Sequence, residues 1–383
     1  MDWMLFAVAV GLAVFGSVMV YSASAMMALK ETQNESDLIY FYKQFGFTLL
    51  GIIAMVFVSR VDYHIFQNKK VIYGLLALTF VLVCSVYLFP AINGAHRWIR
   101  FAGFSFQPSE FAKVTIPLFL AWFLTENEDK VGDVKATVLP CLLVMALICG
   151  PILKGPDLGN TMVLCAIFGV VYFAAGARMI HFAPVAAVAA LGGIALLIFE
   201  PFRMRRLIAF LDPCGEENAA GAGYQVCQAL LAVGSGGVLG EGFAKGQQKL
   251  FYLPYPYSDF IFAVVGEELG LLGTLAVVAA FAFFLWRGAR AALNAPDRFG
   301  NLLGVGIVTG IVVQALFNIS VVISILPAKG IPLPFISYGG TSVMITLVAV
   351  GILLNISRAS AEDERAILTA GSIASRKARA GAR

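Results

Sequence analysis

Three carboxylates stand out in the stretch PYPYSDFIFAVVGEELG, residues 254–270, which turns from a polar, proline-containing loop into a long apolar run. Asp259 lies at the junction, where a carboxylate can act as a general base on a hydroxyl or can simply cap the helix that follows. Glu267 lies roughly 12 Å further along a helix, and Glu268 projects about 100° away from it. Paired carboxyls that cleave a glycoside face each other across about 5–9.5 Å, so these acids make a poor hydrolytic pair. We expect Glu267 and Glu268 to pair with polar groups inside the protein.

A second group of charged residues lies in NGAHRWIRFAGFSFQPSEFAK, residues 93–113. Arg97 precedes a tryptophan and another arginine, a pattern that suits either substrate binding or cations that reach lipid headgroups. A proline then opens a helix, and Glu110 falls in its first turn, where the helix dipole favours a negative charge. Glu110 and Lys113 are spaced i,i+3, so they share a helix face and we expect them to pair.

Further polar residues interrupt apolar runs, where buried charges mark function by default. Asp157 in KGPDLGN is either a binding residue or the cap of the next helix. Three prolines and three glycines in residues 318–342 predict a re-entrant or tightly folded outer segment. The run GSGGVLGEG lacks the lysine and hydroxyl residue of a phosphate loop, so nucleotide binding is excluded and a close turn over a substrate is favoured. Besides Asp259, the candidate binding residues are Arg97, Glu110, Lys113, Asp157, Arg205, Lys249, Lys329 and Ser337.

No metal site can be assigned from the spacing of cysteines and histidines, and no cofactor is expected with certainty. A single carboxylate together with substrate phosphates can hold a divalent cation, so Mg²⁺ or Mn²⁺ stays open. No nucleic-acid partner is expected.

The elements that position these residues are predicted to be membrane-spanning helices. Of the 383 residues, 60% are hydrophobic and 13% charged, and the mean hydropathy is +0.85. Soluble domains are about half apolar and about a quarter charged. Apolar runs of about 20 residues without period-2 alternation predict an all-α polytopic membrane protein. The candidate spans are 4–24, 40–59, 71–90, 108–124, 136–153, 158–177, 179–199, 259–286, 302–326 and 335–356.

The short loops on one side of this predicted bundle carry most of the lysines and arginines, which places that side and both termini in the cytoplasm. Residues 1–357 are then one ten-helix domain, and residues 358–383 a basic, disordered cytoplasmic tail.

The long loop 200–258, between the seventh and eighth spans, faces the extracytoplasmic side. We expect its 216–250 part to form a mobile lid, with VCQALLAV as an amphipathic helix at the membrane surface. Cys214 and Cys227 lie in this loop, and whether they form a disulfide is left open, because that depends on an oxidising surrounding.

Together these stretches resemble the SEDS family (shape, elongation, division and sporulation), to which FtsW, RodA and SpoVE belong. The resemblance implies a ten-helix SEDS fold in the bacterial cytoplasmic (inner) membrane. It also implies an inverting glycosyltransferase that polymerises lipid II into β-1,4 glycan strands on undecaprenyl pyrophosphate, at the extracytoplasmic side. The matching motifs run in family order: GAHRWIRFAGFSFQPSEFAK, GPDLGN, RRLIAFLDP, GYQVCQALLAVGSGGVLGEG, SDFIFAVVGEELGLLG and LPAKGIPLPFISYGGTS.

The resemblance assigns the catalytic base to Asp259, and the family's Glu–Lys helix pair to Glu110 and Lys113. Many members read Pro-Glu-Ala-His-Thr-Asp where this chain reads PYPYSD, so Tyr255 and Tyr257 replace a glutamate and a histidine. AKG is FtsW-like and GIPLPF is RodA-like, and we favour the FtsW type without deciding between division and elongation. The implied partners are a class B penicillin-binding protein, as transpeptidase, and other divisome or elongasome proteins.

A leaving pyrophosphate needs no acid, but its growing negative charge must be met by cations, and one carboxylate suffices as the base. Two other functions are compatible with broken helices and buried charges. The main alternative is a flippase or transporter of lipid II. The other is a scaffold that only recruits the transpeptidase, which leaves the buried charges unexplained.

Overall fold

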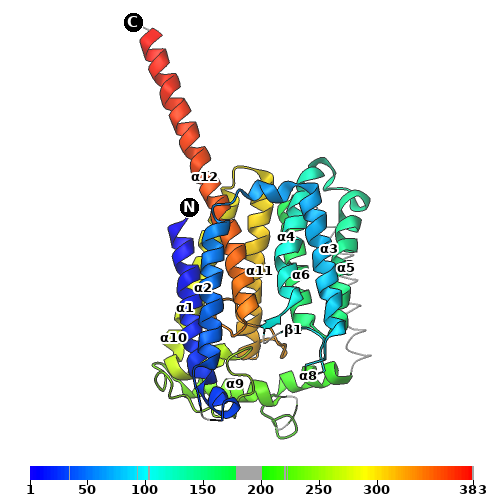
Figure 1. Cartoon of the computed structure of the whole chain (residues 1–383), viewed down its shortest axis with the longest axis vertical. Helices are drawn as coiled ribbons and strands as arrows, with labels where there is room; N and C mark the ends of the chain where they lie inside the picture. Colours follow the sequence, from blue (N-terminus) through cyan, green and yellow to red (C-terminus); the bar gives the residue numbers. More distant parts are fainter. Residues whose placement is uncertain are drawn as a thin grey trace.

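A computed structural model describes residues 1–33, 35–92, 94–101, 104–177, 201–219, 221 and 223–381 of the chain. The long helices form one bundle and run roughly along a common direction (Figure 1). Both ends of the chain lie at one end of this bundle, whereas the short helices α8 (Pro201–Leu211) and α9 (Tyr224–Ser235) lie at the other.

The long helices alternate with short helical turns. The turns are η1 (Tyr63–Gln67), η2 (Val86–Leu88), η3 (Glu128–Lys130) and η4 (Val134–Val138), and the last of these is π-helical. The long helices are α1 (Trp3–Glu31), α2 (Ile39–Val58), α3 (Lys69–Ser85), α4 (Pro108–Glu126), α5 (Leu139–Lys154), α6 (Leu158–Ala174), α10 (Ile261–Leu293), α11 (Arg298–Val322) and α12 (Gly340–Gly381).

Each predicted span except 179–199 coincides with a helix, and 179–199 lies outside the described residues. Within the described ranges, 7 helices are long and apolar enough to cross a membrane, and α6 is apolar but shorter. α4 is not among the 7, although it packs against α3, α6 and α11 inside the bundle.

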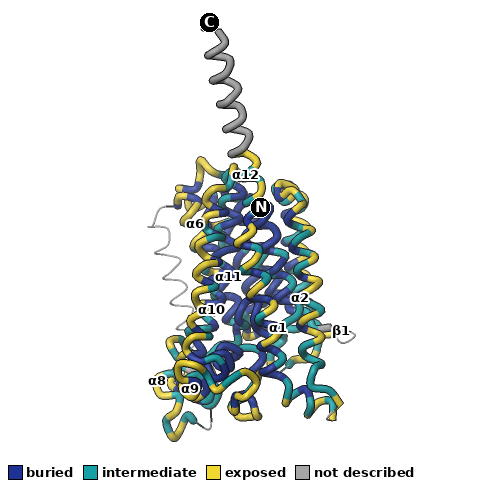
Figure 2. Tube along the Cα trace, turned by 90° about the vertical axis from the view of Figure 1, so that its left-hand side faces the viewer, coloured by how far each residue is buried: buried dark blue, intermediate teal, exposed yellow. Residues whose placement is uncertain are grey.

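The outer surface of the bundle is apolar. Buried residues concentrate on the inward faces of the helices, and exposed residues on the outward faces (Figure 2). Large apolar side chains point outward on opposite parts of the bundle, for example Leu143 on α5, which is 62% exposed, and Leu272 on α10, which is 57% exposed. Water-soluble surfaces rarely carry so much contiguous apolar area, so lipid is the solvent of this face and the chain is a multi-pass membrane protein.

α11 is the central helix, because α10, α6 and α4 all pack against it. Its glycines allow this close approach. A Cβ atom on Gly304 would lie 2.7 Å from the Cβ of Ala292 on α10, and one on Gly306 would lie 2.8 Å from the Cβ of Pro117 on α4. Small residues at such crossings let helix backbones meet in a membrane, where no hydrophobic force drives helices together.

A small antiparallel hairpin departs from the all-α prediction. β1 (Ile99–Phe101) pairs with β2 (Phe104–Phe106), with Ile99 opposite Phe106. The signal was present in WIRFAGFSF, where apolar and smaller or polar residues alternate around an Ala-Gly pair.

The chain after residue 358 also departs from the prediction, because α12 continues as a helix to Gly381 instead of ending in a disordered tail. This segment has no proline, and it is rich in alanine and arginine, which favour helices. Arg358 and Glu362, spaced i,i+4, pair at 2.8 Å at its start.

The segment between α11 and α12 confirms the re-entrant prediction. A Cβ atom on Gly16, midway along α1, would lie 2.5 Å from the backbone of both Phe335 and Ile336. Phe335 packs its ring against Phe281 and Phe284 of α10. The chain therefore dips into the bundle before α12 begins.

Candidate functional site

Asp259 lies at the end of the long loop, two residues before α10 begins. The N-cap of that helix is Phe260, without a side-chain capping hydrogen bond, so Asp259 does not occupy the capping position. Its side chain is partly exposed, and its Oδ1 atom lies 3.1 Å from the hydroxyl of Ser258, which donates to it. This position favours the general-base role over the cap.

The backbone before Asp259 is fixed by the re-entrant segment. Ser337 donates from its hydroxyl to the carbonyl of Ser258 at 2.6 Å, and accepts from the N–H of Leu333 at 2.7 Å. The N–H of Tyr338 donates to the carbonyl of Tyr257 at 2.8 Å. Ser337 is buried and joins the re-entrant segment to the backbone before Asp259, and the substrate contact expected of it stays a prediction.

The carbonyl of Asp259 itself is fixed by α11. Asn318 donates from its amide nitrogen to the carbonyls of Asp259 and Ile331, both at 2.7 Å. One turn earlier, Gln314 donates to the carbonyl of Pro332 at 2.8 Å. Our candidate list omitted both amides, although polar residues spaced i,i+4 on a buried apolar helix are a usable signal.

Gly330 marks the place where Asp259 and Arg97 come together. A Cβ atom on Gly330 would lie 2.8 Å from Oδ2 of Asp259 and 3.7 Å from Nη1 of Arg97. Arg97 is held there by donating to the carbonyls of Gly155, at 3.4 Å, and Pro156. A carboxylate and a guanidinium therefore border one small space, as the predicted site requires.

Lys329 is the next residue along the chain from this space. Its Nζ atom lies 2.8 Å from the sulfur of Met162 on α6, and the residue is partly exposed. The structure therefore brings Arg97, Asp259 and the backbone of Lys329 to one place.

Asp157 has the capping role that we weighed as the alternative. It is the N-cap of α6 and accepts from the backbone N–H of Asn160 at 3.2 Å. The side chains of Asn160, Gln107 and Ser109 also donate to its carboxylate, at 2.8, 3.1 and 3.2 Å. It is buried, so it fixes the start of α6 beside Arg97.

The predicted pairing of Glu110 and Lys113 is confirmed at 2.6 Å, with Glu110 buried and Lys113 partly buried. Ser342 on α12 donates to the other oxygen of Glu110 at 2.7 Å, and Lys113 also donates to Oε1 of Gln314. Because Gln314 binds the re-entrant segment, this ion pair supports the segment that carries Gly330.

Lys249 does not join Asp259. Its ammonium donates to Glu268 at 2.5 Å and to the hydroxyl of Ser22 on α1 at 3.0 Å, and the residue is buried. Ser22 also donates to Glu268, at 2.6 Å. The structure therefore pairs Lys249 with the interior carboxylate of Glu268, which needs a cation as its partner, and the substrate-binding role of Lys249 stays a prediction.

Glu267 also binds the long loop, since its carboxylate accepts from the backbone N–H groups of Gln247 and Gln248 at 2.6 and 2.9 Å. Like Glu268 it is buried, at 1% exposed, against 0% for Glu268. The structural role that we expected for both acids is confirmed.

The glycine-rich run inserts into a break in α10. Gly270 has φ 65° and ψ −161°, outside the helical region. The N–H of Leu271 donates to the carbonyl of Gly237 at 2.9 Å, and the N–H of Gly242 to the carbonyl of Glu268 at 3.0 Å. The prediction of a mobile lid is therefore wrong for this part of the loop, whose backbone is bound to α10.

The rest of the loop is built around α9, which confirms the predicted helix. Its buried residues include Val226 and Ala229, and it packs against α10. Cys214 and Cys227, left open by the sequence, form a disulfide. Arg205 is exposed on α8, and no described contact links its side chain to Asp259.

Tyr257, which stands where many family members have histidine, packs in an aromatic cluster. Its ring centre lies 4.9 Å from that of Tyr40 on α2 and 5.6 Å from that of Tyr338. Burial raises the pKa of Tyr257 above its ordinary value, so the phenol stays protonated. Tyr257 therefore packs the loop beside Asp259 against α2 and the re-entrant segment.

Among the described residues, no group of three or more His, Cys, Asp or Glu side chains is arranged to hold a metal.

The fold and this site define a polytopic helical membrane protein in which a partly exposed carboxylate and a guanidinium border one space at the end opposite its termini. Residues 2–362 match the sequence family described as "Cell cycle protein" and named for FtsW, RodA and SpoVE. The chain belongs to this family.

Relatives cover nearly the whole chain. A probable peptidoglycan glycosyltransferase FtsW from Trichlorobacter lovleyi is 40% identical, over 93% of each chain. The stage V sporulation protein E of Bacillus subtilis is 39% identical, over 94% of this chain and 97% of the relative.

Solved structures agree in fold. The rod shape determining protein RodA of Thermus thermophilus superimposes with a TM-score of 0.67 at 25% identity, covering 93% of this chain and 96% of RodA. A chain from a peptidoglycan synthase complex that coordinates polymerization and crosslinking gives a TM-score of 0.76 at 24% identity, covering 94% of this chain and 98% of that one.

Proposed function

We propose that this protein is a peptidoglycan glycosyltransferase that polymerises lipid II into β-1,4 glycan strands on undecaprenyl pyrophosphate. The observation that carries the proposal is the accessible carboxylate of Asp259 facing Arg97 across Gly330. The named glycosyltransferase relatives at about 40% identity support it, and they also favour the FtsW type.

Asp259 acts as the general base in this proposal. The acceptor hydroxyl oxygen attacks the anomeric carbon of the donor, its proton passes to Asp259, and the bond from that carbon to the pyrophosphate oxygen breaks with inversion. Arg97, with Lys329 near it, meets the negative charge that grows on the leaving pyrophosphate. Glu110, Lys113, Asp157 and Ser337 position the segments that carry these groups.

The site lies on the extracytoplasmic side of the bacterial cytoplasmic (inner) membrane, and both termini lie in the cytoplasm. The basic residues at the end with the termini, Arg60, Arg287 and Arg298 among them, support this orientation. The Cys214–Cys227 disulfide in the opposite loop supports it too, because disulfides persist in oxidising spaces. Because both termini lie at one end of the bundle, the number of crossings must be even. The ten predicted spans, with the large loop between the seventh and the eighth, meet this condition.

The partner is a class B penicillin-binding protein that crosslinks the new strand, with other divisome or elongasome proteins around the pair. Support comes from the similar fold of a chain in a complex that coordinates polymerization and crosslinking.

Gel analysis of products from the purified chain, its class B partner and labelled lipid II tests the proposal. We expect glycan ladders from the wild type and from Asp212→Asn, which changes an exposed carboxylate of the same loop. Movement of lipid II across vesicle membranes without any ladders, from folded and partnered protein, would instead support the transporter.

A further inference from the structure

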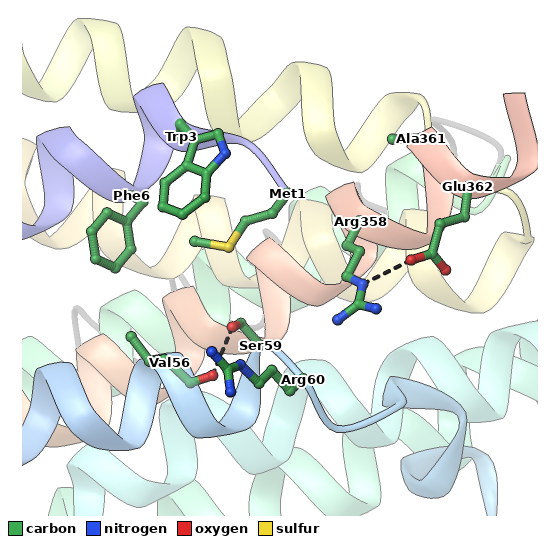
Figure 3. A pocket seen from close by; sticks show the side chains of 9 residues that line it. All are labelled: Met1, Trp3, Phe6, Val56, Ser59, Arg60, Arg358, Ala361 and Glu362. Atoms are coloured by element: carbon green, nitrogen blue, oxygen red, sulfur yellow. Dashed lines mark hydrogen bonds and ion pairs between the residues drawn. The ribbon is translucent and has the colours of Figure 1, made fainter. Parts of the chain in front are cut away.

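A pocket lies at the end of the bundle that carries both termini, opposite to Asp259 (Figure 3). It is an open hollow with a volume of about 370 Å³, lined by the start of α1, the end of α2 and the part of α12 around residue 358. Ligand pockets range over about 300–1,000 Å³, so its size suits a small polar group. None of the chemistry at Asp259 uses it.

One wall of the pocket is cationic. Arg60 follows the end of α2 and Arg358 lies on α12, and both guanidinium groups line the hollow (Figure 3). Glu362 is the carboxylate that lines it, and it pairs with Arg358 at 2.8 Å. Asp2, the acid nearest to Trp3 in the chain, is bound by Arg287 at 2.6 Å. Two cations against one anion leave the lining with surplus positive charge.

The other wall is apolar and lies at the ends of two candidate membrane spans, where α1 begins and α2 ends. Trp3 and Phe6 from the first turns of α1 line it, with Val56 from the last turn of α2 (Figure 3). The indole of Trp3 is 70% exposed, as expected of an aromatic residue at the headgroup level. A soluble anion has no apolar part to pack against this wall, whereas the first carbons of an acyl chain can pack against it.

We propose that this pocket binds the phosphate headgroup of an anionic phospholipid from the leaflet on the side of the termini. Guanidinium groups form paired hydrogen bonds with phosphate oxygens, and basic pockets between membrane helices on this side suit anionic headgroups. The lipid bridges the end of α2 to α12, so it stabilises the folded bundle at the point where α12 leaves it.

The test measures the melting temperature of the purified full chain in neutral detergent as phosphatidylglycerol or phosphatidylcholine is added. We expect phosphatidylglycerol alone to raise it at low concentration. Arg60→Gln should weaken the apparent affinity about fivefold, and Arg60→Gln with Arg358→Gln about 25-fold, from about 1 kcal/mol for each basic residue near an anionic surface. Arg290→Gln, an exposed arginine at the same end outside the pocket, should leave the affinity unchanged.

The proposed lipid site is refuted if the double variant responds to phosphatidylglycerol like the wild type. It is also refuted if Arg290→Gln weakens the response as much as Arg60→Gln does. Should the double variant fail to fold, Arg60→Lys keeps the charge but loses the guanidinium fork, and we expect a weaker response than in the wild type. Glycerol phosphate has the same phosphate group without acyl chains, so it tests whether the pocket binds a lipid or any soluble anion. If it raises the melting temperature as much as phosphatidylglycerol does, the lipid assignment is overturned. Brominated phosphatidylglycerol gives a second readout, because the saturable part of the tryptophan quenching should be lost in Trp3→Phe, whereas the quenching of Trp286, which is 54% exposed on α10, stays in both proteins. Equal saturable quenching in both proteins also overturns the lipid assignment.

Discussion

Two carboxylate sites lie near the start of α10, Asp259 before the helix and the pair Glu267 and Glu268 within it, and they differ in what surrounds the acid. Asp259 is partly exposed, its backbone is held by neighbouring segments, and its Oδ2 atom lies on the same side of Gly330 as the guanidinium of Arg97. Glu267 and Glu268 lie within the helix, fully buried, and bind donors from the loop and from α1.

The difference shows how one motif separates chemistry from folding. A general base must reach the proton of a substrate, so its carboxylate has to stay accessible while its backbone is fixed. A buried carboxylate needs partners from the protein itself, because an unpaired charge in the interior is strongly destabilising. Glu267 and Glu268 bind the long loop, and that loop ends at Asp259.

The largest effect is expected at Asp259. Asp259→Asn is nearly isosteric and removes the base, so glycan synthesis should fall by about 10²–10⁴-fold, with folding and partner binding unchanged. Rates from labelled lipid II, with Asp212→Asn as the matched control, provide the measurement. A near wild-type rate in Asp259→Asn would show that this carboxylate is not the base.

The buried cluster should respond in stability. Glu268→Ala strands the ammonium of Lys249 in the interior, so the free energy of unfolding should fall by about 3–5 kcal/mol. Unfolding by SDS in mixed micelles measures it. Adding Lys249→Met should recover part of the loss, and activity per folded molecule should change far less than in Asp259→Asn. Full stability in the single variant contradicts the assigned role.

Variants of Glu110 and Lys113 test whether a change in stability can be separated from a change in activity. Glu110→Gln leaves Lys113 with the oxygen of Gln314, so we expect a smaller loss of about 1–3 kcal/mol. Because Gln314 also holds the re-entrant segment, activity should fall too. A double-mutant cycle with Lys113→Met should give a coupling of about 0.5–3 kcal/mol, and no coupling would refute the pair.

Local patterns carried much of this arrangement. The apolar runs predicted the helices, and the i,i+3 spacing predicted the pairing of Glu110 with Lys113, because both signals act within a few residues. The length of α12 was missed although its composition favours helix, and the hairpin β1–β2 was missed although its residues alternate.

Contacts between distant segments were beyond such patterns. The partners of Lys249 are Ser22 and Glu268, and neither position in the sequence points to the other. The insertion of the glycine-rich run into α10 depends on the broken backbone at Gly270, which the sequence shows only as one more glycine. The meeting of Arg97 with Asp259 depends on three separate segments.

Gly330 offers the finest test of the comparison, because it changes the surroundings of Asp259 and not the acid. The Cβ atom of Gly330→Ala would lie 2.8 Å from Oδ2, so the carboxylate must turn away, whereas the backbone that holds it stays in place. Because small displacements of catalytic groups are costly, we expect activity to fall about tenfold with unchanged stability. Gly339→Ala is the matched control in the same segment, since its Cβ would meet only the Cβ of Ser342 at an ordinary 3.5 Å. If both variants keep full activity, the space between Arg97 and Asp259 is not where the substrate reacts. If both lose stability alike, Gly330 serves the packing of the re-entrant segment, as the glycines around Glu268 serve theirs.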